Sequence, residues 1–310
     1  MKEYKFDIIK ELKYGENPHQ KACLCTGEEM ADYEVLFDKE LSYDNILNLY
    51  EITRILGEFY DVPAVAIMKH ASCCGVALGR DIEDAYNKAF DCDPVSAFYG
   101  TIGFSRELDY ETAKHVNSMG VKAIIAPDFH PKAIDLIKDN SGLKLVKLNT
   151  PLKDLRSMCS EEIKITPFGV LIQDKNNSEL DKDLFKVVTK TKPTTEQIED
   201  AIFAWKVIKH ASTDSAVVVK DFATLGIAKN ETNSAAAIDS ALKIACDRSK
   251  DAIIATDGII YSQDAIYAAV QGRVSMIIQP GGSHKDEDII NLADRYGIAM
   301  IMTGIRNHKY

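Results

Sequence analysis

Two series of apolar runs and amphipathic stretches follow one another along this chain in the same order. Each series opens with an apolar run that ends in lysine, Ala64–Met68 before Lys69 and Ala216–Val219 before Lys220. The two lysines lie 151 positions apart, and Pro127 and Pro280, which follow later apolar runs, lie 153 positions apart. Nearly equal offsets at two landmarks predict a tandem α/β unit.

Strands and helices are predicted to alternate within each series. The predicted strands are Ala64–Met68, Ile102–Phe104 and Ala123–Ala126 in the first series, and Ala216–Val219, Ile253–Thr256 and Val274–Ile278 in the second. The predicted helices are Ile82–Phe90, Glu111–Met119 and Lys132–Lys138, then Ala235–Cys246, Asp264–Gln271 and Asp286–Tyr296. This order predicts an α/β fold with mixed or parallel sheets covered by helices on both faces.

The remaining segments set the predicted domain boundaries. An N-terminal stretch with a helix at Asp44–Phe59 precedes the first series. Two polar stretches, 148–167 and 173–193, are interpreted as a connector with some local strand structure. We therefore predict one domain over residues 1–195, with the N-terminal segment, the first repeat and the connector. A second domain over residues 196–310 holds the second repeat.

Composition excludes several classes of partner. The 47 acidic residues exceed the 37 lysines and arginines, which gives a net charge of −10 and argues against nucleic acid or an anionic membrane surface as a partner. The start of the chain lacks the apolar core of a signal peptide, and seven cysteines are interpreted as reduced thiols, so a cytoplasmic protein is expected. Neither Cys23-x-Cys25 nor Cys73-Cys74 has the spacing of a zinc site, and no bound metal is expected.

The dipeptide Lys69-His70 lies where an apolar strand ends, which is where open α/β sheets usually place their chemistry. Adjacent strand residues point to opposite faces, so both side chains reach one site only if the backbone bends there. We expect the stretch up to Gly75 to form that turn. The alternative is a surface lysine beside a histidine at the edge of the core.

Five segments together resemble one family. They are Leu12–Gln20, Lys69-His70, Asp93–Phe98, Ile278–Ser283 and Gly297–Met300. In this order and spacing they resemble the AICAR transformylases, which act in purine biosynthesis and are usually fused to an IMP cyclohydrolase. The resemblance runs from about Leu12 to the C-terminus and implies a free-standing transformylase domain without the cyclohydrolase half. It also implies tandem cytidine-deaminase-like layers without zinc and a homodimer with active sites shared across its interface.

The resemblance assigns roles to individual residues. His70 would be the base for the 5-amino group of AICAR, and Lys69 would stabilise charge at the formyl group or assist release of tetrahydrofolate. The formyl donor, as co-substrate, would be 10-formyltetrahydrofolate. The positions that match nucleotide-binding residues are Lys13, Tyr14, Tyr99, Asp214 and Arg306. Those that match folate-binding residues are Gly281, Gly282, Ile259 and Asp264.

Several of these positions depart from the family pattern. Ser234 stands where the family has a substrate-binding arginine, with Lys229 nearby, and Asp214 replaces an asparagine. Tyr99 replaces a glycine, Lys122 replaces an acidic residue, and the loop at 259–263 has lost most of the family's aromatic rings. Two hypotheses follow: formyl transfer to AICAR, or a divergent paralogue that binds a purine nucleotide without formyl transfer or acts on a different substrate.

Overall fold

The computed structural model describes residues 3–27, 29–180 and 185–310, which form two compact units. The first unit comprises the chain up to Pro63, then Met68–Ser72 and Phe98–Asn177. The second comprises Ala64–Ile67, Cys73–Ala97 and the chain from Ser178 to Tyr310. The predicted boundary between residues 195 and 196 stays a prediction.

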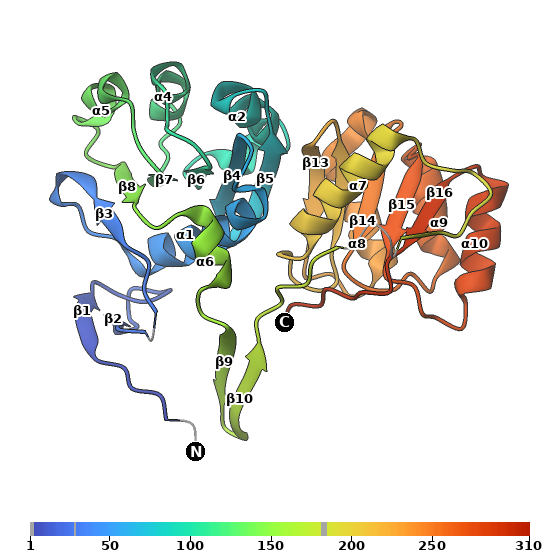
Figure 1. The fold of residues 1–310 in the computed structure, drawn as a ribbon, viewed down its shortest axis with the longest axis horizontal. Helices are drawn as coiled ribbons and strands as arrows, with labels where there is room; N and C mark the ends of the chain where they lie inside the picture. The colour runs from blue at the N-terminus through green and yellow to red at the C-terminus, as the bar shows by residue number, and fades with distance from the viewer. Residues whose placement is uncertain (1–2, 28, 181–184) are drawn as a thin grey trace. The chain divides into compact units, whose positions relative to one another are not determined.

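The first unit combines hairpins with a sheet and helices (Figure 1). Its strands are β1 (Ile8–Leu12), β2 (Ala22–Cys25), β3 (Tyr33–Val35), β6 (Thr101–Phe104), β7 (Ala123–Ala126), β8 (Lys144–Leu148), β9 (Glu161–Thr166) and β10 (Gly169–Asp174). Its helices are α1 (Tyr43–Leu56), α4 (Tyr110–Asn117), α5 (Pro131–Ile137) and α6 (Leu152–Ser157), with 3-10 turns at Leu36–Asp38 and Gly57–Phe59. Strands β6, β7 and β8 are parallel, β3 pairs antiparallel with β8, and β1–β2 and β9–β10 are separate antiparallel pairs.

The second unit is built on a larger mixed sheet. Its strands are β4 (Ala64–Lys69, ending in the first unit), β5 (Ser72–Leu78), β11 (Lys186–Val187), β12 (Ala216–Lys220), β13 (Ala223–Ala228), β14 (Ile253–Thr256), β15 (Met276–Gln279) and β16 (Ala299–Met302). They are hydrogen-bonded in the order β11-β16-β15-β14-β12-β13-β5-β4. Its helices are α2 (Ile82–Phe90), α3 (Pro94–Ala97), α7 (Thr195–Ile208), α8 (Ser234–Ala245), α9 (Gln263–Gln271) and α10 (Asp286–Arg295), with a 3-10 turn at Cys246–Ser249. The predicted α/β class with a mixed sheet is confirmed.

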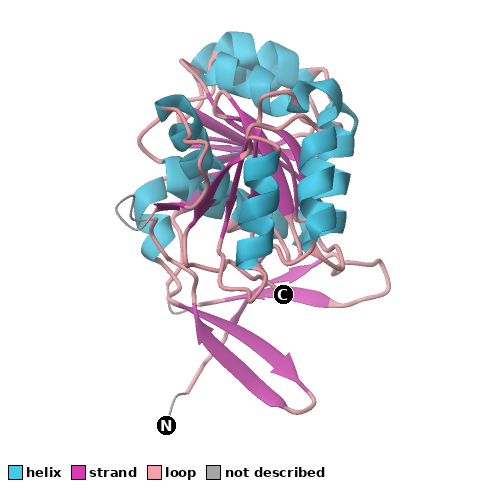
Figure 2. Cartoon of the chain, turned by 90° about the vertical axis from the view of Figure 1, so that its right-hand side faces the viewer, coloured by secondary structure: helices cyan, strands magenta, loops and turns pink. Residues whose placement is uncertain are grey.

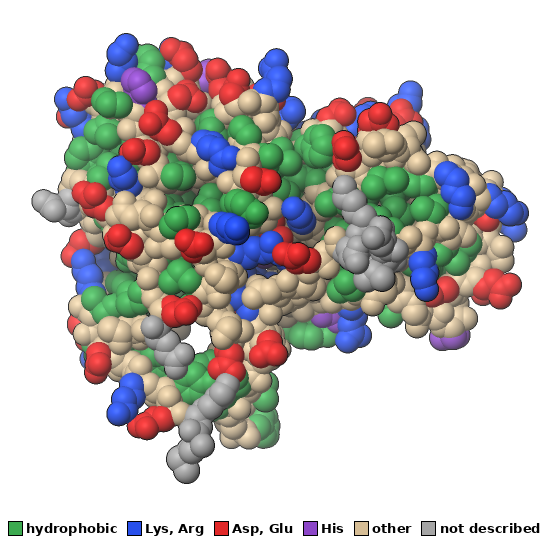
Figure 3. Space-filling model, in the orientation of Figure 1, with side chains coloured by type: hydrophobic (Ala, Val, Ile, Leu, Met, Phe, Trp, Pro, Cys, Tyr) green, Lys and Arg blue, Asp and Glu red, His purple; other side chains and the backbone are tan. Residues whose placement is uncertain are grey.

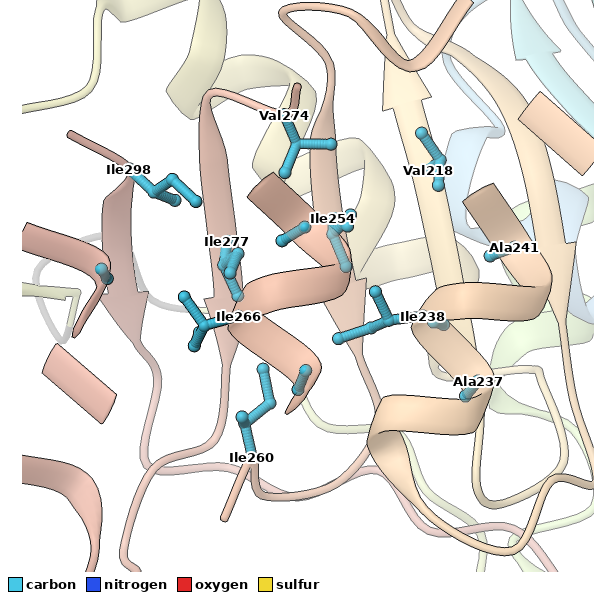
Figure 4. Packing of buried hydrophobic residues seen from close by; sticks show 14 of the residues in the cluster. Val218, Ala237, Ile238, Ala241, Ile254, Ile260, Ile266, Val274, Ile277 and Ile298 are labelled. Carbon is cyan, nitrogen blue, oxygen red and sulfur yellow. The ribbon is translucent and has the colours of Figure 1, made fainter. Parts of the chain in front are cut away.

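Helices cover both faces of this sheet because its strands are apolar on both sides (Figure 2). On one face, Val218, Ile254 and Ile277 form a buried cluster with apolar residues of α8, α9 and α10 (Figure 4). Helix α7 contacts β12, β14 and β15 but contributes nothing to that cluster, so it covers the other face. The core of the second unit therefore lies in two layers, one on each side of the sheet.

The two predicted series correspond closely to the elements that form. Helices α1 and α7, which precede the two series, are both fourteen residues long and both begin at a capping box, Ser42 with Asn45 and Thr194 with Gln197. In each series a two-strand hairpin follows, then a helix and parallel strands. The predicted turn from Lys69 to Gly75 is wrong, however. The chain reverses over His70 and Ala71 alone, and Gly75 lies inside β5.

Gly75 has a packing role instead of a bending role. A Cβ at Gly75 would overlap the carbonyl oxygen of Ala89 in α2, and one at Gly226 of β13 would overlap that of Ala241 in α8. Gly75 and Gly226 lie 151 positions apart, the same offset as the two lysines. Each glycine lets a helix backbone lie directly on its strand.

No helix among the described residues is both long and apolar enough to cross a membrane. On the face drawn in Figure 3, lysine and arginine side chains are interspersed with aspartate and glutamate. That face therefore carries a mixed charge pattern and not a continuous basic patch.

Replacing Gly226 with alanine should lower the free energy of unfolding by about 1–3 kcal/mol, because the obstructing atom belongs to backbone and cannot rotate away. Urea unfolding followed by the fluorescence of buried Trp205 measures this loss. Gly142→Ala is the matched control, since its Cβ would meet nothing closer than Asn140 Oδ1 at 3.7 Å. Equal midpoints for both variants would contradict the close-contact explanation.

Candidate active-site residues

Lys69 and His70 lie at the tip of the β4–β5 hairpin. His70 and Ala71 have φ of 54° and 53°, the left-handed backbone of a two-residue turn that normally favours Asn or Gly. The Ala71 amide donates a hydrogen bond of 2.8 Å to Oδ1 of Asn48 in α1. A side chain from α1 therefore holds a strained turn in place, at a conformational cost of about 1–3 kcal/mol per residue.

The second unit uses the same backbone turn with different side chains. Asp221 and Phe222, between β12 and β13, have φ of 54° and 56°. The carboxylate of Asp200 in α7 accepts hydrogen bonds from both amides, at 2.9 and 2.7 Å. Burial raises the pKa of Asp200, while these two amides oppose the shift. The two hairpins thus share this backbone turn, and the imidazole is particular to the first hairpin.

The His70 side chain is 80% exposed, with a carboxylate on one side. Its Nδ1 lies 3.9 Å from Oδ1 of Asp44, in the first turn of α1. The other Asp44 oxygen accepts a hydrogen bond of 3.1 Å from Nδ2 of Asn48. Asn48 therefore positions both the turn and the carboxylate. With Nδ1 toward Asp44, Nε2 on the far side of the ring can accept a proton.

Lys13 and Tyr14 lie in the loop that joins β1 to β2. Lys13 is exposed and Tyr14 half-buried. The loop is closed by its own hydrogen bonds, from Gly15 N to Gln20 O and from Asn17 N and Nδ2 to Gln20 Oε1, each between 2.8 and 2.9 Å. The side chains of Asn17 and Gln20 thus help to close this loop.

Tyr99 has φ of 60°, a left-handed backbone that glycine adopts more readily than tyrosine. The ring is 60% exposed and lies against Gly120. Lys122 Nζ lies 5.2 Å from its centroid, within the range of a cation–π contact. The two departures at Tyr99 and Lys122 are therefore in contact and accommodate each other.

Polar residues gather at one edge of the second unit's sheet. Strands β14, β15 and β16 are parallel, and Asp257, Pro280 and Thr303 follow their carboxyl ends. Strand β12 runs antiparallel to β14, so the residues before it, Asp214 and Ser215, lie at the same edge. This is where open α/β sheets bind ligands.

Asp214, Asp257 and His308 form a compact group at that edge, each offering an atom within 4.8 Å of the others. Asp257 is buried and accepts hydrogen bonds from Thr213 Oγ1 at 2.6 Å and from the Ser215 amide at 2.7 Å. Burial and the neighbouring Asp257 raise the pKa of Asp214, and His308 opposes that shift. Of the described residues, this is the one group arranged to hold a metal ion; the expectation of no metal stays a prediction.

The amides of the glycine-rich turn after β15 are partly occupied by a side chain of the helix that follows the turn, α10. Gly281 and Gly282 have φ of 70° and 102°. The Asp286 carboxylate accepts the Gly282 and Ser283 amides at 2.7 and 3.1 Å. A ligand at this turn would meet amides that already have an acceptor. Ile259 Cδ1 lies 4.0 Å from where a Cβ of Gly282 would be, so these two predicted folate positions are neighbours.

Asp264 lies in the first turn of α9 and accepts a hydrogen bond from Ser262 Oγ at 3.1 Å. Beside it is a cavity of about 260 Å³, lined by Tyr261, Ser262, Gln263, Lys285, Asp288 and Ile289. Arg306 is exposed beyond β16. Lys229 Nζ donates to the Cys73 carbonyl at 3.2 Å, and Ser234 is buried at the start of α8.

Comparison with known proteins identifies the relatives. The family model described as the AICARFT/IMPCHase bienzyme matches residues 1–244. The chain belongs to this family. Proteins named bifunctional purine biosynthesis protein PurH from Acetivibrio thermocellus and Thermoanaerobacter sp. are 37% identical over 98% and 99% of this chain. The PurH protein of Caldicellulosiruptor saccharolyticus is 38% identical over 98%.

The chain spans about 60% of the length of these family members. Two solved structures, forms 1 and 2 of Acinetobacter baumannii RibD, align with 34% of this chain and 33% of theirs. Their identities are 16% and 15% and their TM-score is 0.25, a similarity too low to bear on the fold.

The predicted site residues divide between the two units. Those in the first are Lys13, Tyr14, Lys69, His70 and Tyr99, and those in the second are Asp214, Ile259, Asp264, Gly281, Gly282 and Arg306. Asp44, Asn48, Asp257 and His308 were missed. Asp44 and Asn48 share an i, i+4 spacing just after the cap Ser42, and Asp257 directly follows an apolar strand; both signals were present in the sequence.

Replacing Asp214 with asparagine should stabilise the protein near neutral pH. A raised pKa means that the folded state holds the Asp214 proton more tightly than the unfolded chain, so stability falls as pH rises through that range. The asparagine removes this loss, and the gain should shrink as pH falls toward the ordinary aspartate pKa of about 3.9. Thermal unfolding across pH measures it, with Asp139→Asn on the surface as control. A gain that is independent of pH would contradict this account.

Proposed function

We propose that this chain transfers a formyl group from 10-formyltetrahydrofolate to the 5-amino group of AICAR, giving FAICAR and tetrahydrofolate. Membership of the AICARFT/IMPCHase family and the purine-biosynthesis name of the PurH relatives support the reaction class. The observation that carries the proposal is the exposed His70 ring with Asp44 beside Nδ1, next to Lys69.

In the proposed mechanism, the amine of AICAR attacks the formyl carbon and His70 Nε2 accepts the proton that the amine loses. Lys69 stabilises the negative charge that develops on the formyl oxygen. The bond from the formyl carbon to N10 of the folate then breaks, and N10 takes up a proton. Asp44 orients the imidazole and stabilises the imidazolium formed during the transfer.

Substrate recognition is proposed for the other positions. Lys13 and Arg306 would neutralise the nucleotide phosphate, and Tyr14, Tyr99 and Asp214 would contact the remainder of the nucleotide. Gly281, Gly282, Ile259 and Asp264 would bind the folate. Because Asp286 occupies two amides of the glycine turn, folate binding there would require Asp286 to move or would use the turn's shape alone.

We also propose that the fold is a tandem duplication of cytidine-deaminase-like layers without zinc. Four pairs of features support the duplication: the capped helices α1 and α7, the left-handed turns after Lys69 and Lys220, the buried glycines at 75 and 226, and the parallel strands that follow.

The active form is proposed to be a cytoplasmic homodimer with shared active sites, acting on a small nucleotide and not on nucleic acid or membranes. The hairpin β9–β10 supports an assembly. Its apolar residues Ile165, Phe168 and Leu171 are 85%, 102% and 62% exposed. An isolated two-stranded hairpin is marginally stable in water, so an apolar one favours a covered state.

Formyl transfer is tested by turnover with AICAR and 10-formyltetrahydrofolate. His70→Ala should lower kcat by about 10²–10⁴-fold through loss of the general base. Asp44→Asn should cause a smaller loss in kcat with little change in KM, because Asp44 orients the base without touching substrate. His115→Ala, at an exposed histidine on α4, should behave as the unaltered protein.

Absence of turnover in the unaltered protein would overturn the proposed activity. AICAR binding by calorimetry without turnover would instead favour the paralogue hypothesis. Full activity in His70→Ala would reject this residue as the base while leaving the reaction class standing.

The hairpin should be required for dimerisation. Phe168→Asp should weaken the dimer at least about tenfold, since a buried aromatic anchor typically contributes more than about 1–2 kcal/mol to an interface. Sedimentation velocity at micromolar concentration measures the change. Val95→Asp is the control, because Val95 is 83% exposed on α3, away from the hairpin in sequence. A monomeric unaltered protein, or an unchanged dimer in Phe168→Asp, would contradict this proposal.

A further inference from the structure

A cavity in the first unit lies apart from every predicted site residue. Its volume is about 220 Å³, and none of Lys13, Tyr14, Lys69, His70 or Tyr99 lines it. The walls are mainly apolar side chains of α1, β8, α6 and neighbouring segments: Leu41, Ile46, Leu49, Val146, Leu148 and Leu155. A cavity of about 150 Å³ accommodates benzene, so this one has room for a substituted single ring.

Two cations lie against one aromatic ring at the polar end of this cavity. The Arg54 guanidinium carbon is 5.4 Å and Lys175 Nζ is 5.9 Å from the centroid of the Tyr50 ring. All three residues line the cavity. The Tyr50 ring is therefore within cation–π range of both positive charges.

Arg54 is buried and incompletely paired. Only 8% of the residue is exposed, and Nε has no hydrogen-bond partner among the described residues. Nη1 lies 3.9 Å from Glu51 Oε1 and Nη2 3.5 Å from Glu162 Oε1, both beyond ordinary charge-assisted hydrogen-bond distance. A buried donor without an acceptor lowers the stability of the folded state. The Arg54 guanidinium can therefore accommodate a further anionic oxygen as a hydrogen-bond acceptor.

Lys175 adds a second donor at the same end. Its Nζ donates one hydrogen bond, to the Met158 carbonyl at 3.1 Å. Burial and the neighbouring Arg54 lower the pKa of Lys175. Glu29 is the one carboxylate residue among those lining the cavity, and its Oε2 already accepts the Cys159 amide at 2.9 Å. Among the residues that line the cavity, the two cations outnumber the one carboxylate; Glu51 and Glu162, beside Arg54, do not line it.

We propose that this cavity binds a small organic acid, with its apolar body among the aliphatic side chains and its carboxylate beside Arg54 and Lys175. The aliphatic walls contact the body of the ligand, and the two cations supply charge-assisted hydrogen bonds to one end. The inference does not rest on the proposed formyl transfer, since no lining residue belongs to that machinery.

The competing interpretation is purely structural. Glu162 belongs to β9, so Arg54 and Glu162 could serve only to tie the β9–β10 hairpin to α1. In that case removal of Arg54 would loosen the hairpin but the cavity would show no preference for an acid over a neutral molecule of equal shape.

The test uses the full chain and a matched pair of probes, 4-methylbenzoate and 4-methylbenzamide, in calorimetry and ligand-detected NMR. The acid should bind at least about tenfold more tightly than the amide, because only the acid offers a charged acceptor to the two cations. Arg54→Gln and Lys175→Gln should each weaken acid binding by about tenfold or more and leave the amide unchanged. Arg80→Gln, an exposed arginine of the second unit, should change neither.

Equal binding of acid and amide to the unaltered protein would overturn the proposal, as would binding of neither at millimolar concentration. Undiminished acid binding in both Arg54→Gln and Lys175→Gln would also overturn it. Should Arg54→Gln fail to fold, the Lys175 variant and the comparison of the two probes on the unaltered protein decide the question.

Discussion

One hydrogen bond, from the Ala71 amide to the Asn48 side chain, fixes the candidate catalytic pair in space. His70 and Ala71 both occupy left-handed backbone conformations, which neither residue favours, so the turn needs support from outside. Helix α1 supplies it and is itself fixed by the capping box at Ser42 and by close packing on β6. There Gly103 leaves room for Ile52 and Leu56. The position of the His70 side chain therefore depends on how α1, about twenty residues earlier in the chain, packs on the sheet.

Much of the framework was predictable because apolar periodicity survives in the sequence. Helix α2 and strands β7 and β14 have the predicted bounds, and the other predicted elements differ by one to three residues at an end. Several elements were not predicted, among them β5, β8, β13, β16 and α7. The turn after Lys69 was mislocated because glycine is ordinarily a bending residue. At Gly75 the absence of a side chain serves contact with α2 instead. A local pattern cannot distinguish these two uses of glycine, since the second depends on a helix that packs from elsewhere.

The candidate site was predictable only where residues carried a motif. Lys69-His70 and the glycine turn at 281–282 were found in this way, whereas the side chains that surround them were not. Asp286 accepts the amides of the glycine turn, and Asp257 accepts a hydroxyl and an amide next to Asp214. Which donors a carboxylate accepts depends on its side-chain rotamer and on the order of the strands in the sheet. Neither can be deduced from a local sequence pattern. The roles assigned to these residues come from the resemblance to the family and stay proposals.

The two left-handed turns share a backbone but carry different side chains. At one tip an amide of Asn48 supports a solvent-facing imidazole; at the other the Asp200 carboxylate satisfies both amides of a turn whose own side chains are Asp221 and Phe222. Under the proposed duplication, the first hairpin would retain a reactive side chain, whereas the turn of the second hairpin would have only a structural role. Mutational tolerance should then be asymmetric between equivalent positions: narrow at residue 70, where chemistry constrains identity, and broader at residue 221, where only conformation does.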